Sequence, residues 1–195
     1  MVVVLLAVYV ATLAAILHPH VSSAYRAYFI DRTTKDYDPT HYDSTPEQGM
    51  TFQHIGLPQW VDTVYGFGAR EDGGRWTDSN LGTTAGLNFN RSFAGELCLD
   101  FTAHAVAWMA GQSIRFRMDH QEQSLRIETE APTDYRLQFT DLQGAHQLQF
   151  MLPKMPTVVE RRHGAEDPRR LGINISTLRL IPGKCSAGQE DAPRR

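Results

Sequence analysis

Residues 69–78 are the most distinctive stretch of this 195-residue chain, because several side chains that could do chemistry crowd together there. They contain three carboxylates, two guanidinium groups and one indole ring, carried by Glu71, Asp72, Asp78, Arg70, Arg75 and Trp76. Two facing carboxylates are the catalytic groups of most glycoside hydrolases. An indole ring beside Arg and Asp can instead hold a sugar, because the ring packs against the pyranose face while the charged groups bond its hydroxyls. A third interpretation is internal: the arginines pair with the acids and fold the loop above Trp76.

A second distinctive stretch, residues 167–173, carries one further candidate. Asp167 and Pro168 are typical of the start of a turn, and Gly172 permits a close approach of two backbones. Arg169 could pair with Glu71 or Asp72 if the two stretches meet at one end of the domain. The sequence therefore predicts candidate ligand-binding residues, while internal pairing stays open as the alternative. These candidates are Glu71, Arg75, Trp76, Asp78 and Arg169.

The sequence offers no signature of a catalytic, metal or cofactor site. The nucleophile motif GxSxG, the zinc motif HExxH, the P-loop and the dinucleotide motif GxGxxG are all absent. The eight histidines are dispersed, and His104 is expected to be a hydrogen-bonded structural histidine. We therefore predict no catalytic residue, no metal and no cofactor. The net charge of −3, with scattered basic residues, also argues against a nucleic-acid partner.

The two cysteines, Cys98 and Cys185, belong to no CxxC or Cys/His metal spacing. They can form one disulfide in an oxidising compartment or remain two inert thiols. Cys98 alternates with Leu97 and Leu99, so its side chain is expected to point away from the core. The sequence leaves both alternatives open, and the pair is a possible disulfide.

Alternation of apolar and polar residues is the dominant signal beyond residue 50. Short alternating runs, separated by Gly, Pro, Asp or Asn, occupy residues 87–89, 97–101, 114–118, 125–127, 135–139, 148–150, 173–175 and 178–180. Antiparallel sheets with one wet face have this pattern, whereas parallel sheets show continuous apolar runs with intervening helices. The predicted fold class is all-β: an antiparallel β-sandwich of the jelly-roll kind, preceded by an N-terminal apolar helix. One short helical turn is expected at residues 58–64, where a proline comes early.

The N-terminal segment at residues 2–17 reads VVVLLAVYVATLAAIL and carries no charge. As a helix it would be about 24 Å long, and with residues 18–21 it could cross a bilayer core of roughly 30 Å. It could also be a secretory signal, cleaved near the small residues 21–24, or a buried core helix. Arg26, Arg32 and Lys35 follow the segment, and the positive-inside rule would place that side in the cytoplasm. The conflict is resolved if the chain is the tail of a longer multi-span protein.

These signals divide the chain into four parts. Residues 1–24 are predicted to be a transmembrane anchor or signal segment, and residues 25–50 a linker. Residues 51–183 are predicted to form the β-sandwich domain, and residues 184–195 a disordered tail. Contact with the membrane is assigned to residues 2–21.

Taken together, the two distinctive stretches resemble the C-terminal periplasmic domain of the phosphoglycerol transferase I family. Those enzymes decorate osmoregulated periplasmic glucans in Gram-negative bacteria, and related domains end other large envelope proteins. The family pattern is roughly an aromatic or apolar strand, a Gly-x-Pro turn, SGxSxxExWGRWS, several strands and a closing PRxLGIG strand. This chain has Phe52, Gly56-Leu57-Pro58, GFGAREDGGRWT at residues 66–77 and DPRRLGIN at residues 167–174. The resemblance covers residues 51–181.

Three departures from the family pattern limit what the resemblance carries over. The family's first tryptophan is Gly73 here, its serine after Gly-x is Gly68, and its Gly-Asn-rich turn is replaced by residues 106–111. If that first tryptophan contacts glycan, Trp60 or Trp108 would have to replace it. The family's metal-dependent, alkaline-phosphatase-like catalytic domain has no counterpart in these residues, so phosphoglycerol transfer is not carried over.

The resemblance implies a non-catalytic accessory module, tethered to the inner membrane with its sandwich domain in the periplasm. Its expected partners are envelope glycan or a membrane-bound transferase. The alternative is a structural or protein-interaction domain that is the C-terminal part of a larger multi-span transferase. A surface groove with aromatic and carboxylate groups would favour glycan binding, whereas burial of Trp76 and Arg75 in internal pairs would favour the structural alternative.

Overall fold

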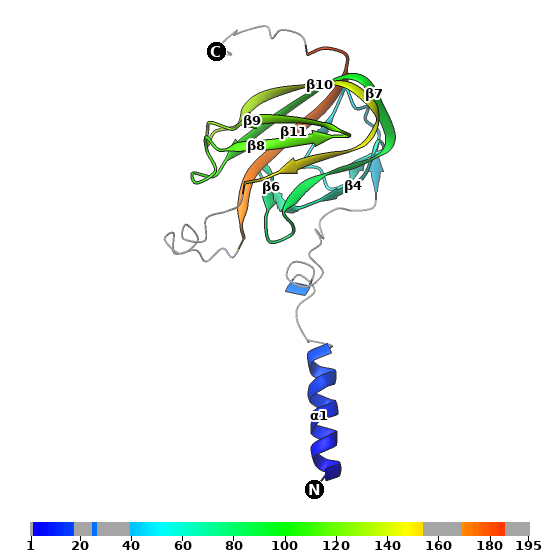
Figure 1. Cartoon of the computed structure of the whole chain (residues 1–195), viewed down its shortest axis with the longest axis vertical. Helices are drawn as coiled ribbons and strands as arrows, with labels where there is room; N and C mark the ends of the chain where they lie inside the picture. The colour runs from blue at the N-terminus through cyan, green and yellow to red at the C-terminus, as the bar shows by residue number, and fades with distance from the viewer. Residues whose placement is uncertain (1, 18–24, 27–39, 154–168, 186–195) are drawn as a thin grey trace.

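A computed structural model describes residues 2–17, 25–26, 40–153 and 169–185. Within these residues the chain forms helix α1 and a β-sandwich (Figure 1). The elements are α1 (Val2–Leu17), β1 (His41–Tyr42), β2 (Met50–Thr51), β3 (Leu57–Pro58), β4 (Val61–Tyr65), β5 (Phe67–Glu71), β6 (Gly74–Asp78), β7 (Thr84–Ala105), β8 (Ser113–Met118), β9 (Gln121–Arg126), β10 (Thr133–Met151) and β11 (Leu171–Pro182). All pairings in the main sheet are antiparallel, which confirms the predicted fold class.

Two very long strands, β7 of 22 residues and β10 of 19, run through both layers of the sandwich (Figure 1). In layer A, the first half of β7 lies between β4 and the second half of β10, which is followed by β8 and β9. In layer B, the second half of β7 lies between the first half of β10 and β11. Strands β6 and β2 pair with successive parts of β11, and β5 pairs with β6. The pairing of β7 with β10 therefore joins the two layers.

Both long strands change layers at a set of irregularities. The register of β10 against β7 shifts three times between Phe139 and Gln147. Gly95, Asp141 and Gly144 have positive φ values of 78°, 55° and 110° in the same region. Bulges bend and twist a strand locally, which lets one strand pass from one sheet to the other. The short runs predicted from the sequence are thus halves of continuous strands.

Aromatic side chains fill the space between the layers. The Phe101 ring of β7 lies 5.2 Å from the Phe116 ring of β8, measured between centroids. The Phe67 ring of β5 lies 5.9 Å from the Phe150 ring of β10. All four side chains are fully buried. In β7, β8 and β10 they occupy the predicted apolar positions, because every second residue of a strand faces the core.

Two local expectations are wrong. Residues 58–64 form no helical turn, because this region contains the end of β3 and most of β4, and β4 pairs with β7. Residues 69–78 are not a loop but most of the hairpin β5–β6, with Asp72 and Gly73 at its turn. The alternation of β6 was hidden in the sequence because a charged residue, Arg75, occupies a core position.

Strand pairing begins before residue 51, the predicted start of the sandwich. Strand β1 pairs with β3, and β2 pairs with β11. Residues 41–42 and 50 of the expected linker therefore take part in the folded domain. The expectations for residues 18–24, 27–39 and 186–195 lie outside the described residues.

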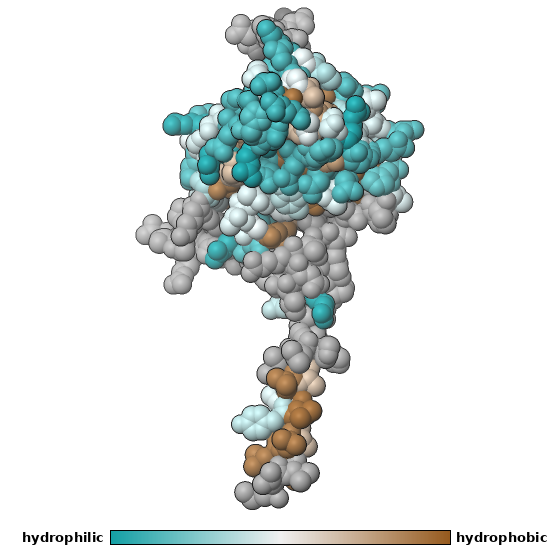
Figure 2. Space-filling view, turned by 45° about the vertical axis from the view of Figure 1, so that its right-hand side comes forward, coloured by the Kyte–Doolittle hydropathy of each residue, from teal (hydrophilic) through white to brown (hydrophobic). Residues whose placement is uncertain are grey.

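Helix α1 is the predicted N-terminal helix. Its 16 residues carry no charge, and the side chains of Val4, Leu6 and Val10 are 68%, 67% and 60% exposed. Figure 2 shows apolar side chains along this helix. Among the described residues, no helix combines the length and the apolar character needed to cross a membrane.

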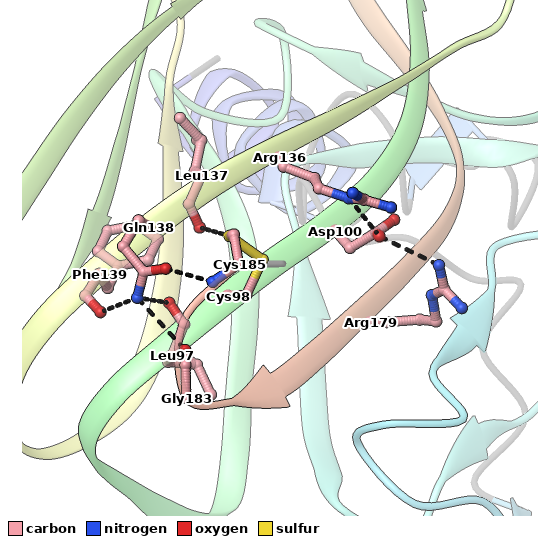
Figure 3. The surroundings of a disulfide bond; sticks show 10 residues. All are labelled: Leu97, Cys98, Asp100, Arg136, Leu137, Gln138, Phe139, Arg179, Gly183 and Cys185. Carbon is pink, nitrogen blue, oxygen red and sulfur yellow. Dashed lines mark hydrogen bonds and ion pairs between the residues drawn. A yellow bond between two sulfur atoms is a disulfide. The ribbon is translucent and has the colours of Figure 1, made fainter. Parts of the chain in front are cut away.

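Cys98 and Cys185 form a disulfide, which resolves the alternative that the sequence left open (Figure 3). Cys98 lies on the outer face of layer B, as expected, but is only 2% exposed. The side chain of Gln138 on β10 forms hydrogen bonds with the segment after β11 and keeps this segment next to Cys98. The Gln138 Nε2 donates to Gly183 O at 3.3 Å, and the Gln138 Oε1 accepts from Cys185 N at 2.5 Å. The disulfide thus fastens the segment after β11 to β7.

We predict that replacing both cysteines by alanine lowers the free energy of unfolding by about 2–5 kcal/mol, because the bond restricts the unfolded chain. Urea unfolding of the full chain, followed by circular dichroism, measures the difference. A reductant should lower the stability of the natural chain to that of the variant and leave the variant unchanged. Equal stability of the oxidised natural chain and the variant would contradict the prediction.

Candidate functional site

The two distinctive stretches meet where β5 and β6 lie beside the start of β11. Arg169, just before β11, forms an ion pair with Glu71 at the end of β5. The other carboxylate oxygen of Glu71 accepts a hydrogen bond from the Trp76 indole, with Nε1 and Oε2 3.1 Å apart. The predicted pairing of Arg169 with Glu71 is confirmed, and both oxygens of the carboxylate are used internally. Asp167 and Pro168, the predicted turn, lie outside the described residues.

Arg75 is fully buried in the core. Its side chain faces inward because Arg75 pairs with Ile175, a core position of β11. The guanidinium donates from Nε to Phe52 O at 3.3 Å and from Nη1 to Gly68 O at 3.2 Å. A buried cation is tolerated only where its donors find acceptors. Here the acceptors belong to two separate segments, so Arg75 joins the chain after β2 to strand β5.

Asp78 and Thr77 hold the hairpin to the start of β11. Asp78 is 1% exposed, and its Oδ1 accepts from Arg170 N at 3.1 Å. Thr77 Oγ1 accepts from Ile173 N at 2.9 Å. Gly172 makes this contact possible, since a Cβ there would lie 2.7 Å from Thr77 Oγ1. The close approach predicted at Gly172 is found, but it is made by the side chains of Thr77 and Leu152 rather than by another backbone segment.

Trp76 lies half-buried on the outer face of layer B, beside His104. The two rings meet edge to face, with centroids 4.9 Å apart. Burial lowers the pKa of His104 below its ordinary value, which favours the neutral imidazole next to the indole. His104 therefore has a structural role, but through this ring contact rather than through the hydrogen bond that the sequence predicts.

The five predicted ligand-binding residues divide into two groups. Glu71, Trp76 and Arg169 are half-buried and bond one another at the surface. Arg75 and Asp78 lie inside and bond backbone groups, so neither reaches a surface ligand. These two correct the sequence interpretation, because a charged side chain can satisfy buried backbone groups as well as a ligand.

Trp60 and Trp108, which were expected to replace the family's first tryptophan, both pack within the sandwich. Trp60 is 3% exposed and packs near Phe89, with ring centroids 5.9 Å apart. The Trp108 indole is half-buried and donates from Nε1 to Leu171 O at 3.1 Å. Both rings therefore support the sandwich.

A polar groove of about 410 Å³ lies on the outer face of layer B, and the sequence analysis missed it. Strands β7, β10 and β11 supply its floor, and residues 42 and 48–51 supply the side next to β2. We call it the Asp100 groove. Its lining includes Tyr42, Asp100, Thr102, Asp134, Arg136, Thr177 and Arg179.

Asp100, one of the lining residues, lies between two arginines of the groove (Figure 3). Its side chain is 8% exposed, and its Oδ2 accepts from Arg136 Nε at 3.0 Å and from Arg179 Nη2 at 3.1 Å. Both arginines are directly opposite Asp100, one on each neighbouring strand, so the register explains the contact. Figure 3 shows the two guanidinium groups approaching the carboxylate from opposite sides. The arginine side chains are 45% and 47% exposed, so they also face solvent.

Hydroxyl groups continue the groove beyond Asp100. Thr177 Oγ1 donates to Thr102 Oγ1 at 2.9 Å, and Thr102 Oγ1 donates to Asp134 Oδ1 at 2.6 Å. Tyr42 adds an aromatic ring, and burial raises the pKa of its phenol, which therefore stays neutral at physiological pH. Two carboxylates and two guanidinium groups line the groove, so their formal charges cancel.

This arrangement suits a neutral ligand that both donates and accepts hydrogen bonds. Among the described residues, no group of His, Cys, Asp and Glu side chains could hold a metal ion. Half of the lining residues on β7, β10 and β11, namely Asp100, Arg136 and Arg179, are the polar members of runs that the sequence showed to alternate. Alternation places them on a wet face, but only the register brings Asp100, Arg136 and Arg179 together.

The fold and this groove define a β-sandwich module with a neutral, polar outer face. The chain belongs to the family described as a domain of unknown function, DUF7024, whose model matches residues 35–182. The match runs through the whole described sandwich, from β1 to the end of β11.

Curated relatives confirm the resemblance to the phosphoglycerol transferase I family. Phosphoglycerol transferase I of Citrobacter koseri is 28% identical over 130 residues, which cover 67% of this chain and 17% of the relative. The enzyme of the same name from Escherichia fergusonii is 25% identical over the same length and coverage. The match thus spans about one sixth of the length of these relatives.

The solved structures that resemble the chain are distant. A variant of the family 29 carbohydrate-binding module CBM29-2 has a TM-score of 0.42 and 11% identity, covering 68% of this chain and 88% of that chain. A ruminal GH26 endo-β-1,4-mannanase has a TM-score of 0.37 and 9% identity, covering 72% of this chain and 22% of that chain.

We predict that Arg75→Met lowers the free energy of unfolding by about 2–4 kcal/mol, because it leaves buried carbonyl groups without donors. Urea unfolding of the full chain measures the loss. The matched control is Arg115→Met, because Arg115 is 57% exposed and forms a surface pair with Glu122. The control should change stability by no more than about 0.5 kcal/mol. Similar values for both variants would show that the buried guanidinium is not needed.

Proposed function

We propose that this chain is a non-catalytic accessory module that binds glycan during phosphoglycerol transferase-type modification of the cell envelope. The observation that carries the proposal is the Asp100 groove, which lies on a chain related to phosphoglycerol transferase I. The module would hold the polysaccharide, while the transfer chemistry would be done by a separate catalytic domain. A polymer held near a catalytic domain reacts at a higher effective concentration.

The chemistry of the groove supports glycan as the ligand. A sugar hydroxyl donates one hydrogen bond and accepts others, and the groove offers both kinds of partner. Arg136 and Arg179 supply planar donors, while Thr102 and Thr177 can exchange donor and acceptor roles. The Tyr42 ring supplies an apolar surface for the carbon-bound face of a sugar. The formal charges of the groove cancel, so it carries no net charge that would favour an ionic ligand over a neutral one.

The disulfide supports a periplasmic location. Disulfides persist in oxidising compartments, including the bacterial periplasm, and are rare in the cytosol. Cys98 and Cys185 form such a bond beside the groove. We therefore place the sandwich in the periplasm, with residues 2–21 tethering it to the inner membrane. The uncharged α1, with its exposed apolar side chains, is the feature that supports the tether.

A second candidate function is a structural or protein-interaction domain within a larger multi-span transferase. The observation that favours it is the internal use of the residues in the two distinctive stretches. Arg75 bonds backbone carbonyls in the core, and Trp76 bonds Glu71. In this case the partner would be a membrane-bound transferase rather than a glycan.

We predict that the full chain in mild detergent binds osmoregulated periplasmic glucan saturably in calorimetry. The double variant Thr102→Val/Thr177→Val should bind at least about fivefold more weakly, because it removes two hydroxyls at a cost of roughly 0.5–1.5 kcal/mol each. Valine keeps the β-branched shape, so the sheet should persist. Thr140→Val, on exposed β10 backbone away from the groove, is the matched control and should bind normally. A folded natural chain that binds no glucan would favour the structural candidate.

We also predict that the natural chain stays with the membrane fraction after alkaline carbonate extraction. Leu6→Lys/Val10→Lys should release it, since each charge near the centre of a span costs roughly 2.5–3.5 kcal/mol. Leu6→Val/Val10→Leu keeps the helix apolar and should remain bound. Recovery of the natural chain in the soluble fraction would contradict the proposed membrane tether. It would have no bearing on glycan binding in the Asp100 groove.

A further inference from the structure

A second polar surface lies on the outer face of layer A, on the other side of the sandwich from the Asp100 groove. Five side chains on four strands form one continuous hydrogen-bonded line, which we call the amide row. In order they are Arg117 on β8, Gln149 and Gln147 on β10, Asn88 on β7, and Thr63 on β4. None of them belongs to a motif that the sequence analysis singled out.

Every bond of the amide row runs in the same direction. Arg117 Nε donates to Gln149 Oε1 at 2.9 Å, and Gln149 Nε2 donates to Gln147 Oε1 at 2.8 Å. Gln147 Nε2 donates to Asn88 Oδ1 at 2.8 Å, and Asn88 Nδ2 donates to Thr63 Oγ1 at 2.7 Å. The side-chain dipoles therefore point head to tail from the guanidinium, and such chains strengthen one another.

Strand register explains why these residues meet. Gln149 is directly opposite Arg117, and Gln147 is directly opposite Asn88. Asn88 is also directly opposite Thr63. Side chains that face each other across neighbouring strands lie close enough to bond. The neighbouring residues Leu148 and Leu87 point into the core, so the amides must point outward.

Tyr65 places an aromatic ring beside the amide row. It is directly opposite Gly86, and a Cβ on that glycine would lie 2.6 Å from the Tyr65 hydroxyl oxygen. The missing side chain therefore lets the ring lie across the face. Burial raises the pKa of the Tyr65 phenol, while Gln149 and Arg117 lower it by smaller amounts. The ring is thus held against the row and stays neutral.

The amide row keeps hydrogen-bonding capacity for a ligand. Each carboxamide nitrogen carries two hydrogens, and the row uses one of them at Asn88, Gln147 and Gln149. All three side chains are partly exposed. A hollow of about 180 Å³ adjoins the arginine end and is lined by Arg117, Gln147 and Gln149, among others.

The composition of this face selects the kind of ligand. The row itself contains a single cation, Arg117, and the adjoining hollow adds one carboxylate, Asp119, so the charges balance and neither sign dominates as it would for an acidic or basic protein partner. Among the described residues of the sandwich, Ile55 is the exposed large apolar side chain, and it is not part of this face. A protein partner would need an apolar centre. Amides next to an aromatic ring match a chain of neutral hydroxyl-bearing rings.

We propose that the amide row is a second glycan-contacting surface, which takes a neutral, unsubstituted stretch of a polysaccharide. This proposal rests on the proposed glycan function, but the amide row consists of different residues from those of the Asp100 groove. The two surfaces face away from each other, so both can be occupied at once. Two simultaneous contacts with one polymer raise the overall affinity without any new bond.

The test is a proton–nitrogen correlation spectrum of the full chain in mild detergent, recorded while periplasmic glucan stripped of phosphoglycerol is added. The expected result is a shift of the side-chain amide signals of Asn88, Gln147 and Gln149. This shift should persist in Thr102→Val/Thr177→Val, whose groove is altered. Shifts confined to residues of the groove would overturn the amide row and leave the proposed function standing. Shifts confined to the row would support glycan binding there and contradict glycan binding in the Asp100 groove. The absence of any shift would contradict glycan binding at both surfaces.

A matched pair of variants tests the same inference by affinity. Gln147→Met interrupts the row at two bonds while keeping a side chain of similar length. Gln143→Met makes the same change at an exposed position of β10 outside the row. After both variants are shown to fold, Gln147→Met should bind stripped glucan at least threefold more weakly than Gln143→Met. Equal affinities would contradict the proposal.

Discussion

The pairing of β7 with β10 is the constraint on which the rest of this structure depends. Both strands run through both layers, so their pairing, with its register shifts at the bulges between the layers, sets the outer faces of the whole sandwich. It places Arg136 opposite Asp100 in layer B and Gln147 opposite Asn88 in layer A. A slip by one residue would turn every side chain of a strand to the other face. The bulges near Gly95 and Gly144 let the two strands bend without losing this pairing.

The two most distinctive stretches of the sequence serve this framework more than they serve a ligand. Arg75 and Asp78 bond backbone groups in the interior, and Glu71 holds Arg169 and Trp76 together. Such contacts lock the hairpin β5–β6 against the start of β11. A buried charged residue must be fully bonded, so its neighbours in sequence and space are constrained as well. Motifs of this kind can therefore identify a family while the binding surface lies elsewhere.

Membership in the DUF7024 family and the match to phosphoglycerol transferase I make the chain a relative of one part of that larger enzyme. The match spans 17% of the Citrobacter koseri relative, which is the size of one module within a larger protein. A sandwich with polar outer faces can hold a polymer while another domain acts on it. The groove and the amide row are both neutral or nearly so, and both rest on stiff central strands. Rigid supports of this kind reduce the ordering cost of binding.

The sequence by itself determined the all-β class, most of the core and the outward direction of Cys98, because alternation with period two depends only on local geometry. It also predicted that Gly172 allows close packing and that Arg169 could reach Glu71. Only the tertiary structure decided that Arg75 is buried, that the two cysteines are joined, and that the polar residues of β7, β10 and β11 form a groove. These outcomes depend on strand register, bulges and contacts between residues far apart in the chain. A local pattern shows which face a side chain takes, but the neighbours on that face are chosen by pairing between distant strands.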